Sequence, residues 1–443
     1  MSETTGGRGF SPGAGVRGVE SAPVFRDAAD VMIESGGVEQ PSGSRGLLLL
    51  ADGTRFEGRL FGAEAIAQGE LVFTTGMCGY QESMTDPSFA GQVLTFTYPL
   101  LGNYGIIPGI SESSGVHPRG VVCRHHIGMP DHRDSVGSVH DLLVAHDVPG
   151  IEGIDTRALT RRVREHGTLL CVFGPIERVS EMWDILKEMT PPDSEDLVAE
   201  VTCDQPVLLN SGAQDERGRQ LPRLAAIDCG IKHNILRELC RRFEVVWCPA
   251  TIPLDDIMRD WAPVAVFASN GPGDPAHPGA ATVARHSLAA AVREGMPVMG
   301  ICLGHQLMGL AAGLRTYKLR YGHRGVNQPV LDLETGRVHI TSQNHGFAVE
   351  DPDKGMLAPH PSGARSEIGE NALGTDFEVR HINANDRTVE GLDLVGKSAF
   401  TIQFHPEACP GPHDASPLFD RFSKIVAEHL AGSQRAVVRG GDR

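Results

Sequence analysis

The sequence predicts an α/β protein, in which an N-terminal domain of mixed strands and helices is followed by a C-terminal domain whose mainly parallel sheet is flanked by helices. The length of 443 residues is enough for two or three domains with sizeable cores. From residue 224 onward, apolar runs of strand length alternate with segments of helical spacing, which is typical of parallel strands joined by crossover helices. Between residues 190 and 223 the chain is polar and irregular, which indicates a connection between domains.

Changes in composition divide the chain into five stretches. We predict a disordered extension over residues 1–45 with a short helix near 25–34, an N-terminal domain over 46–190, a linker over 191–222, a second domain over 223–432 and a tail over 433–443. The extension is rich in Gly and Ser and shows no sustained period of strands or helices, so it lacks the pattern of a packed element.

The N-terminal domain begins with a predicted hairpin. Two apolar runs flank Asp52-Gly53, a dipeptide that strongly favours a two-residue hairpin turn. Two further strands are predicted at 70–75 and 92–98. A helix is expected over 156–166, because apolar residues recur there with helical spacing and Gly167 can end the helix.

The second domain shows the alternation that predicts its parallel sheet. Strand and helix segments follow one another along the chain, and ligands are expected near the carboxyl ends of the parallel strands. The predicted strands are 224–228, 244–248, 263–268 and 297–301, and the predicted helices are 232–243 and 280–294.

Charge and composition exclude several classes of protein. The 40 basic and 56 acidic side chains give a net charge of −16, which argues against a general nucleic-acid binder. No apolar run approaches the roughly 20 residues of a membrane span, and the first 45 residues contain no apolar core of a secretory signal. The nine cysteines are an odd number without a C-x-x-C pair, so we expect no disulfide framework and a reducing, cytoplasmic location.

A candidate nucleophile stands where a predicted strand turns into a helix. Gly300-Ile-Cys302-Leu-Gly304 places a glycine two residues to either side of a cysteine, as a tight strand-to-helix turn requires. The positive end of the helix dipole favours thiolate at Cys302, and the backbone N–H of Leu303 is free to face a developing oxyanion. For the other eight cysteines we predict a buried structural role, the commonest role of the residue.

A thiolate nucleophile needs a base, and one candidate lies about a hundred residues downstream. His405-Pro406-Glu407 holds an imidazole and a carboxylate two residues apart, and proline favours extended geometry in the residue before it. Extended backbone places both side chains on one side, so Glu407 can orient His405 and stabilise its protonated form. The sequence therefore predicts a triad of Cys302, His405 and Glu407.

A third segment follows the strand predicted at 263–268. In Ser269-Asn-Gly271-Pro-Gly273-Asp-Pro275, the two glycines leave backbone amides unobstructed for a carbonyl or an oxyanion. A plain Gly/Pro turn would have the same composition, and only the neighbouring triad favours a binding loop.

Together these segments resemble the class I glutamine amidotransferases, in which a triad cysteine attacks the side-chain amide of glutamine. Further segments narrow the resemblance to the small subunit of glutamine-hydrolysing carbamoyl-phosphate synthase, and the similarity extends from about residue 46 to 430. In the N-terminal half these are 79–82, 85–88, 97–99 and 153–157, and in the C-terminal half 343–349 and 408–414. Arg324, Gln328 and Cys409 depart from the usual pattern of this family.

The resemblance implies a role for particular residues. Cys302 would be the nucleophile, His405 the base and Glu407 the group that orients it, while His345 would have a binding role only. Ser88 is the informative member of the implied substrate site, because it places that site at the junction of the two domains. The residues implied to bind L-glutamine are Ser88, Gly271, Gly273, Leu303, Gln306, Asn344, Gly346 and Phe347.

The resemblance also implies a partner. We expect no cofactor in this chain, because the resemblance places the handling of ATP on that partner. A large synthetase subunit would bind ATP and its metal ions, forming a heterodimer with this chain. It would use the ammonia released here to make carbamoyl phosphate from bicarbonate, for arginine and pyrimidine biosynthesis.

Several other functions fit parts of the sequence. An amidotransferase subunit of another synthase would share the triad but lack the N-terminal domain, and a γ-glutamyl hydrolase or cysteine peptidase need not keep residues 343–349. A non-catalytic interaction subunit could keep the fold. Six histidines within thirty residues lack regular ligand spacing, which favours a solvated surface over a zinc site, so no metal ligand is predicted. They are His117, His125, His126, His132, His140 and His146.

Overall fold

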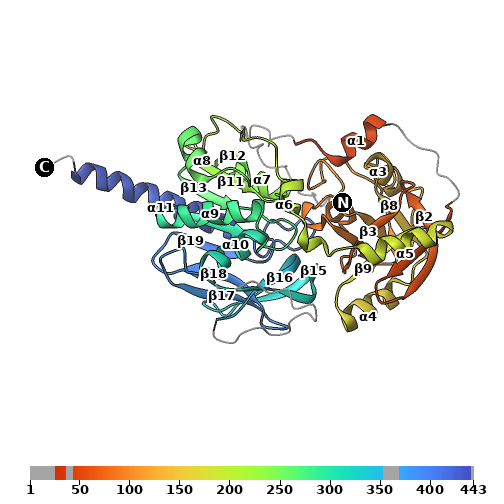
Figure 1. The fold of residues 1–443 in the computed structure, drawn as a ribbon. Helices are drawn as coiled ribbons and strands as arrows, with labels where there is room; N and C mark the ends of the chain where they lie inside the picture. Colours follow the sequence, from red (N-terminus) through yellow and green to blue (C-terminus); the bar gives the residue numbers. More distant parts are fainter. Residues whose placement is uncertain (1–24, 36–42, 353–368, 441–443) are drawn as a thin grey trace, which may run out of the picture.

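The computed structural model describes residues 25–35, 43–352 and 369–440, with side chains up to residue 433. Figure 1 shows two adjoining domains, with the N-terminal one in red to yellow and the C-terminal one in green to blue. The last helix, α11 (Pro417–Gly440), extends beyond the body of the second domain (Figure 1). It therefore continues past residue 432, where the sequence predicted that the domain ends.

The N-terminal domain is built on a closed barrel. The predicted hairpin forms, since β1 and β2 pair antiparallel from Arg45↔Arg59 to Leu49↔Arg55. β3 and β4 also match predicted strands, although each ends one or two residues earlier than expected. The barrel order is β1 (Arg45–Leu50), β2 (Arg55–Gly62), β8 (Pro149–Glu152), β6 (Gly120–Val122), β4 (Gln92–Phe96), β3 (Ala67–Thr74) and β9 (Leu169–Pro175).

Short helices cover this barrel. α4 has the predicted bounds, because the Asp155 side chain accepts from Ala158 N at its start and Gly167, with φ 93°, ends it. A short ladder of β5 (Leu100–Leu101) and β7 (His125–His126) lies beside the barrel. The helical elements are α2 (Tyr80–Met84), η1 (Pro87–Phe89), α3 (Val139–Ala145), α4 (Thr156–His166), η2 (Ile176–Arg178) and α5 (Val179–Glu188).

Part of the predicted extension is ordered. Helix α1 (Ala28–Ser35) falls where a short helix was expected, and Ala28, Ala29 and Met32 are buried in the core of the N-terminal domain. The Asp27 carboxylate accepts hydrogen bonds from the backbone of Gly109 and Ser111, which fixes the start of the helix. Disorder over the whole of 1–45 is therefore wrong for this segment, because its apolar face is buried; residues 1–24 and 36–42 lie outside the described part of the chain.

The C-terminal domain contains a ten-stranded sheet. Its centre is parallel, with β12, β11, β13, β14 and β19 side by side, and the first four of these are the strands that the sequence predicted. The predicted α/β class is confirmed. The parallel strands are β11 (Arg223–Asp228), β12 (Glu244–Pro249), β13 (Ala265–Ala268), β14 (Val298–Ile301) and β19 (Ala399–Ile402), and the helices between them are α7 (His233–Cys240), α8 (Leu254–Trp261), α9 (Ala280–Arg293) and α10 (Leu303–Ala311).

Antiparallel strands extend this sheet on both sides. One side is a four-stranded region that the sequence did not predict, made of β18 (Val389–Leu394), β17 (Phe377–Asn383), β15 (Thr316–Asp332) and β16 (Val338–Val349). On the other side β10 (Val207–Leu209), from the predicted linker, pairs with β12. The linker region also forms η3 (Pro192–Ser194) and α6 (Leu197–Val201), so much of it has regular structure.

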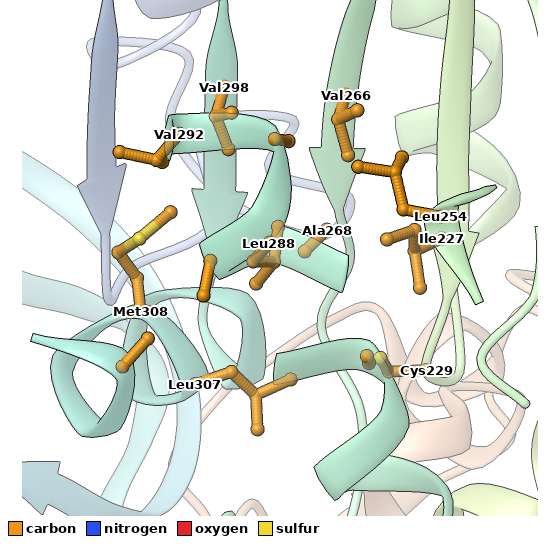
Figure 2. Close-up of a cluster of buried hydrophobic side chains, with 14 of the residues drawn as sticks. Ile227, Cys229, Leu254, Val266, Ala268, Leu288, Val292, Val298, Leu307 and Met308 are labelled. Atoms are coloured by element: carbon orange, nitrogen blue, oxygen red, sulfur yellow. The ribbon is translucent and has the colours of Figure 1, made fainter. Parts of the chain in front are cut away.

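Two apolar clusters hold the central strands in place. In Figure 2, Leu288 and Val292 of α9 and Leu307 and Met308 of α10 gather against strand residues such as Val298. The opposite face packs on α7 and α11 through a second cluster that contains Phe267, Phe400, Phe419 and Phe422. Burying each such side chain stabilises the fold by about 1.5–3 kcal/mol. Because the sheet is packed in this way on both faces, the turn between β14 and α10 is fixed in place. Within the described ranges, no helix combines the length and the apolar character needed to cross a membrane.

Candidate active site

Cys302 lies at the turn between β14 and α10. Its backbone has φ 53° and ψ −101°, a region that side-chain-bearing residues rarely adopt, and its side chain is buried. Its N–H donates to Ile402 O (2.8 Å) and its Sγ lies 3.7 Å from Asn344 O. The amide of Leu303, at the first position of α10, has no partner within the helix. The predicted strand-to-helix turn is therefore present, with the sulfur at the helix N-terminus.

The two flanking glycines are required by close approach. A Cβ on Gly300 would lie 2.8 Å from the backbone of Gly304, and one on Gly304 would lie 2.4 Å from Ala268 O. Since such contacts are shorter than atoms tolerate, only glycine lets α10 begin this close to β13. Gly304 N also donates to Ser269 O (3.0 Å), which ties the helix start to the predicted binding loop.

His405 and Glu407 follow β19 and form the predicted pair. His405 Nδ1 lies 2.7 Å from Glu407 Oε1, and both side chains are buried. His405 N donates to Ser342 O (2.9 Å), which fixes the segment against β16. Nε2 of His405 makes no hydrogen bond of ordinary length to any residue that the structure describes, which leaves this nitrogen for the thiol.

Charge in this pair is stabilised despite its burial. Burial lowers the pKa of His405, but the charge of Glu407 and the interaction with the Cys302 side chain outweigh it and raise the pKa to about 10. Burial raises the pKa of Glu407, but Lys232 and His405 outweigh it and lower the pKa to about 2. At neutral pH the pair is therefore an imidazolium beside a carboxylate.

Glu407 is also held by Lys232, just before α7, and by Asn234, in the first turn of α7. Lys232 Nζ donates to Glu407 Oε1 (3.0 Å) and to the carbonyls of Ala408 (2.9 Å) and Cys409 (3.0 Å). Asn234 Nδ2 donates to Glu407 O (2.7 Å) and lies 3.1 Å from Cys409 Sγ. The sequence interpretation missed both residues, although they follow the carboxyl end of a parallel strand, where ligands and functional groups are expected.

A cavity opens beside Cys302 at the junction of the two domains. Leu303, also implied to bind glutamine, does not line this cavity. Its side chain packs into the hydrophobic core, and its backbone adjoins the site. His405 and Glu407 lie behind the thiol. Seven of the eight residues implied to bind glutamine line this cavity: Ser88, Gly271, Gly273, Gln306, Asn344, Gly346 and Phe347.

The N-terminal domain contributes Ser88 to this cavity through η1. Its Oγ accepts from Asn270 Nδ2 (2.9 Å), so the hydroxyl proton is free to be donated to a ligand. Asp86 accepts from Ser88 N (2.9 Å) and from Asn344 Nδ2 (2.9 Å) and thereby joins η1 to β16. The sequence placed Ser88 at the junction but missed Asp86 and Asn270, although Asn270 stands within the recognised glycine segment.

Other polar groups complete the cavity. Gln306 Nε2 donates to Phe347 O (2.8 Å), so its amide oxygen is left for a ligand. His345 also lines the cavity, and burial lowers its pKa well below the usual value, so this imidazole is neutral. Lys318 pairs with Glu70 and Asp193 at the wall. Buried Arg324, one of the departures in the sequence, lines the same cavity.

A second cavity lies on the other side of the triad. Both domains line it, with Glu82 and Tyr98 from the first and His405 and Cys409 from the second. Asn344 and Arg324 line both cavities, so these two side chains separate them. The thiol therefore faces one cavity and the imidazole the other.

The histidine-rich stretch of the N-terminal domain has protein partners. His126 contacts Glu152, His140 accepts from Gly62 N and His117 contacts Ser113. In the described ranges, the side chains close enough to share an ion are His323, His345 and Glu390, with donor atoms within 4.8 Å of one another. The single N–H of a neutral His345 can be donated from Nδ1 to Phe347 O (2.7 Å), so this ring already has a protein partner.

Comparisons with known proteins agree with this architecture. The family described as carbamoyl-phosphate synthase small chain, CPSase domain, matches residues 48–173, and glutamine amidotransferase class-I matches residues 225–425. Relatives named carbamoyl phosphate synthase small chain are similar over most of the chain. The one from Syntrophotalea carbinolica is 42% identical (87% of this chain, 98% of the relative), that from Methanosarcina mazei 41% (86% and 98%) and that from Thermotoga maritima 40% (87% and 99%). The chain thus belongs to the carbamoyl phosphate synthase small chain family.

Proposed function

We propose that the chain hydrolyses L-glutamine to glutamate and ammonia, with Cys302 as nucleophile, His405 as base and acid, and Glu407 as the residue that orients His405. The observation that carries the proposal is the position of Cys302 at a cavity of the domain junction, beside the buried His405–Glu407 pair. A sulfur at a helix N-terminus, with an imidazole and an orienting carboxylate beside it, is the arrangement of a nucleophilic cysteine.

In the first half of the reaction, the Cys302 sulfur attacks the carboxamide carbon. The charge that develops on the amide oxygen faces the N–H of Leu303; losing one such donor typically costs about 2.7–4 kcal/mol of barrier. When the C–N bond breaks, His405 gives its proton to the departing ammonia. A water molecule, deprotonated by His405, then attacks the thioester, which releases glutamate and returns the thiol.

Substrate recognition follows from the cavity wall. The free hydroxyl proton of Ser88 suits the α-carboxylate of glutamine, and the amide oxygen of Gln306 suits a donor of the substrate. A Cβ on Gly271 would lie 2.0 Å from Cys229 O, so glycine allows the loop to pass close to the nucleophile turn. Asn344, Gly346 and Phe347 close the cavity from β16.

We further propose that the ammonia passes to a large synthetase subunit, as the family name implies. That subunit would supply the ATP and metal-ion chemistry that makes carbamoyl phosphate from bicarbonate, for arginine and pyrimidine biosynthesis. The match of residues 48–173 to a domain named for this synthase favours it over amidotransferases of other synthases.

A glutaminase assay with the Cys302→Ser variant tests the reaction. Wild-type protein should release glutamate, and the variant should lose at least about a thousandfold in kcat, since a serine hydroxyl is a much weaker nucleophile than a cysteine thiol. A glutamine-like electrophile should label Cys302 in the wild type. Near-normal turnover by the variant would refute the nucleophile assignment, and an unlabelled, inactive wild type would favour a non-catalytic subunit. Copurification with the large subunit, together with faster hydrolysis in its presence, would support the proposed partner.

A further inference from the structure

Glu112 lies in the N-terminal domain, between β5 and β6, and it accepts hydrogen bonds from the start of α7 in the other domain. The residue is fully buried, and its own N–H donates to Thr85 Oγ1 (2.8 Å), which fixes it in its domain. Its Oε2 accepts from Asn234 N (3.0 Å), and its carbonyl accepts from His233 N (2.8 Å). Two backbone amides of the first turn of α7 are therefore held by one residue across the domain junction.

The residues at this helix start also hold the triad carboxylate. Lys232 Nζ and Asn234 Nδ2 bond Glu407 at its side chain and its carbonyl, as described above. A chain of direct contacts thus runs from Glu112 through Asn234 and Lys232 to Glu407, and from Glu407 to Nδ1 of His405 (2.7 Å). A shift of Glu112 must move or strain the groups that position the imidazole.

We propose that Glu112 is a positioning residue for glutamine hydrolysis, through which the placement of the N-terminal domain sets the geometry of the Glu407–His405 pair. The inference rests on the proposed function and deepens it, because it gives the N-terminal domain a role in the chemistry besides supplying Ser88. Glu112 does not line the cavity beside Cys302, so it acts on the triad through the start of α7 and through its charge.

The charge of Glu112 strengthens this argument. Burial raises its pKa to about 7, with Glu407 acting in the same direction, while Lys232, the bond from Asn234 and Arg237 oppose the rise. Cys409 lies nearby, since Glu112 is one of the groups that raise the pKa of that thiol. Near neutral pH the carboxyl therefore changes between a neutral and an ionised form. The ionised form accepts a stronger bond from Asn234 N–H and attracts Lys232, so it holds the start of α7 more firmly.

The test compares Glu112→Gln and Glu112→Ala in the full chain. The glutamine side chain can still accept from Asn234 N–H but carries no charge, whereas alanine removes the contact. Glu152→Gln is the matched control, because Glu152 bonds His126 (3.2 Å) within the N-terminal domain. The kcat and KM for glutamine are measured from pH 6 to 9, together with the rate at which a glutamine-like electrophile labels Cys302.

For the wild type we expect kcat to rise through pH 7. Glu112→Gln should match it at pH 6, fall about fivefold below it at pH 8 and keep KM, because only the charge-assisted part of the bond is lost. Glu112→Ala should be slower at every pH, and Glu152→Gln should follow the wild type. If Glu112→Ala does not fold, Glu112→Gln still decides.

The outcomes separate this inference from the proposed function. A pH profile of Glu112→Gln that stays within twofold of the wild type, in both turnover and labelling, would overturn the positioning role and leave glutamine hydrolysis intact. A wild type without glutaminase activity would overturn the proposed function. A labelling rate of Cys302 that rises through pH 7 in the wild type but not in Glu112→Gln would then still support the coupling of Glu112 to Cys302.

Discussion

Replacing Gly304 with alanine tests whether close approach holds the nucleophile turn in place. Alanine normally stabilises a helix relative to glycine by about 1 kcal/mol, so helix propensity alone predicts a gain. At Gly304, however, the new Cβ would lie 2.4 Å from Ala268 O and 2.9 Å from Ala268 C, which are backbone atoms of a central strand. Since neither side can rotate away, the turn or the strand must shift, and overpacking of this kind costs about 1–3 kcal/mol.

The expected result is a change in sign relative to a matched substitution. Gly432 also lies in a helix, α11, but it is exposed and a Cβ there meets nothing within 4 Å. Gly432→Ala should therefore keep or raise the melting temperature, whereas Gly304→Ala should lower it by roughly 2–12 °C, at about 2–4 °C per kcal/mol for a domain of roughly 200 residues.

Activity provides the second readout for the same pair of variants. Gly304 is two residues from Cys302, and its N–H is bonded to Ser269 O (3.0 Å), so a shift here displaces both the sulfur and the binding loop. A misplacement of about 1 Å can cost about a hundredfold in rate, and we expect kcat for glutamine to fall by that order. Calorimetry and a glutaminase assay check both effects. If Gly304→Ala melts at or above the wild-type temperature with unchanged kcat, the steric account of the turn is wrong.

Two further substitutions probe the triad and the substrate cavity. Glu407→Gln removes the charge that helps to raise the pKa of His405 to about 10, so that pKa should fall. Activity should then be lost at a lower pH on the alkaline side, and kcat should drop at least about tenfold. A pH–rate profile measures both effects. An unchanged alkaline limb would contradict the proposed role of Glu407. Ser88→Ala removes the hydroxyl proposed to bind the α-carboxylate of glutamine, and it leaves Asn270 Nδ2 without the oxygen that accepts from it (2.9 Å). KM for glutamine should therefore rise about five- to twentyfold, with kcat largely kept. Equal KM values for variant and wild type would exclude Ser88 from substrate binding.

The sequence by itself determined the features that depend on neighbouring residues. The turn at Cys302 was predictable because the two glycines that mark it stand two positions to either side of the cysteine, and the position of Glu407 beside His405 followed from the two-residue period of extended backbone. The four parallel strands and α4 were predictable for the same reason, since burial on both faces or on one helical face leaves a pattern within a single segment.

Only the tertiary structure decided which distant groups meet. Glu112 and Asn234 are 122 positions apart and Lys232 and Glu407 are 175 apart, and no local periodicity links such pairs. The linker strand β10 and the strands from β15 to β18 were missed because a strand at the sheet edge, or one interrupted by register shifts, mixes polar and apolar residues without a clear period. The sequence thus determined the nucleophile turn and its base, while the packing of two domains determined what holds them in position, because buried charges are stabilised by partners that only the folded chain brings together.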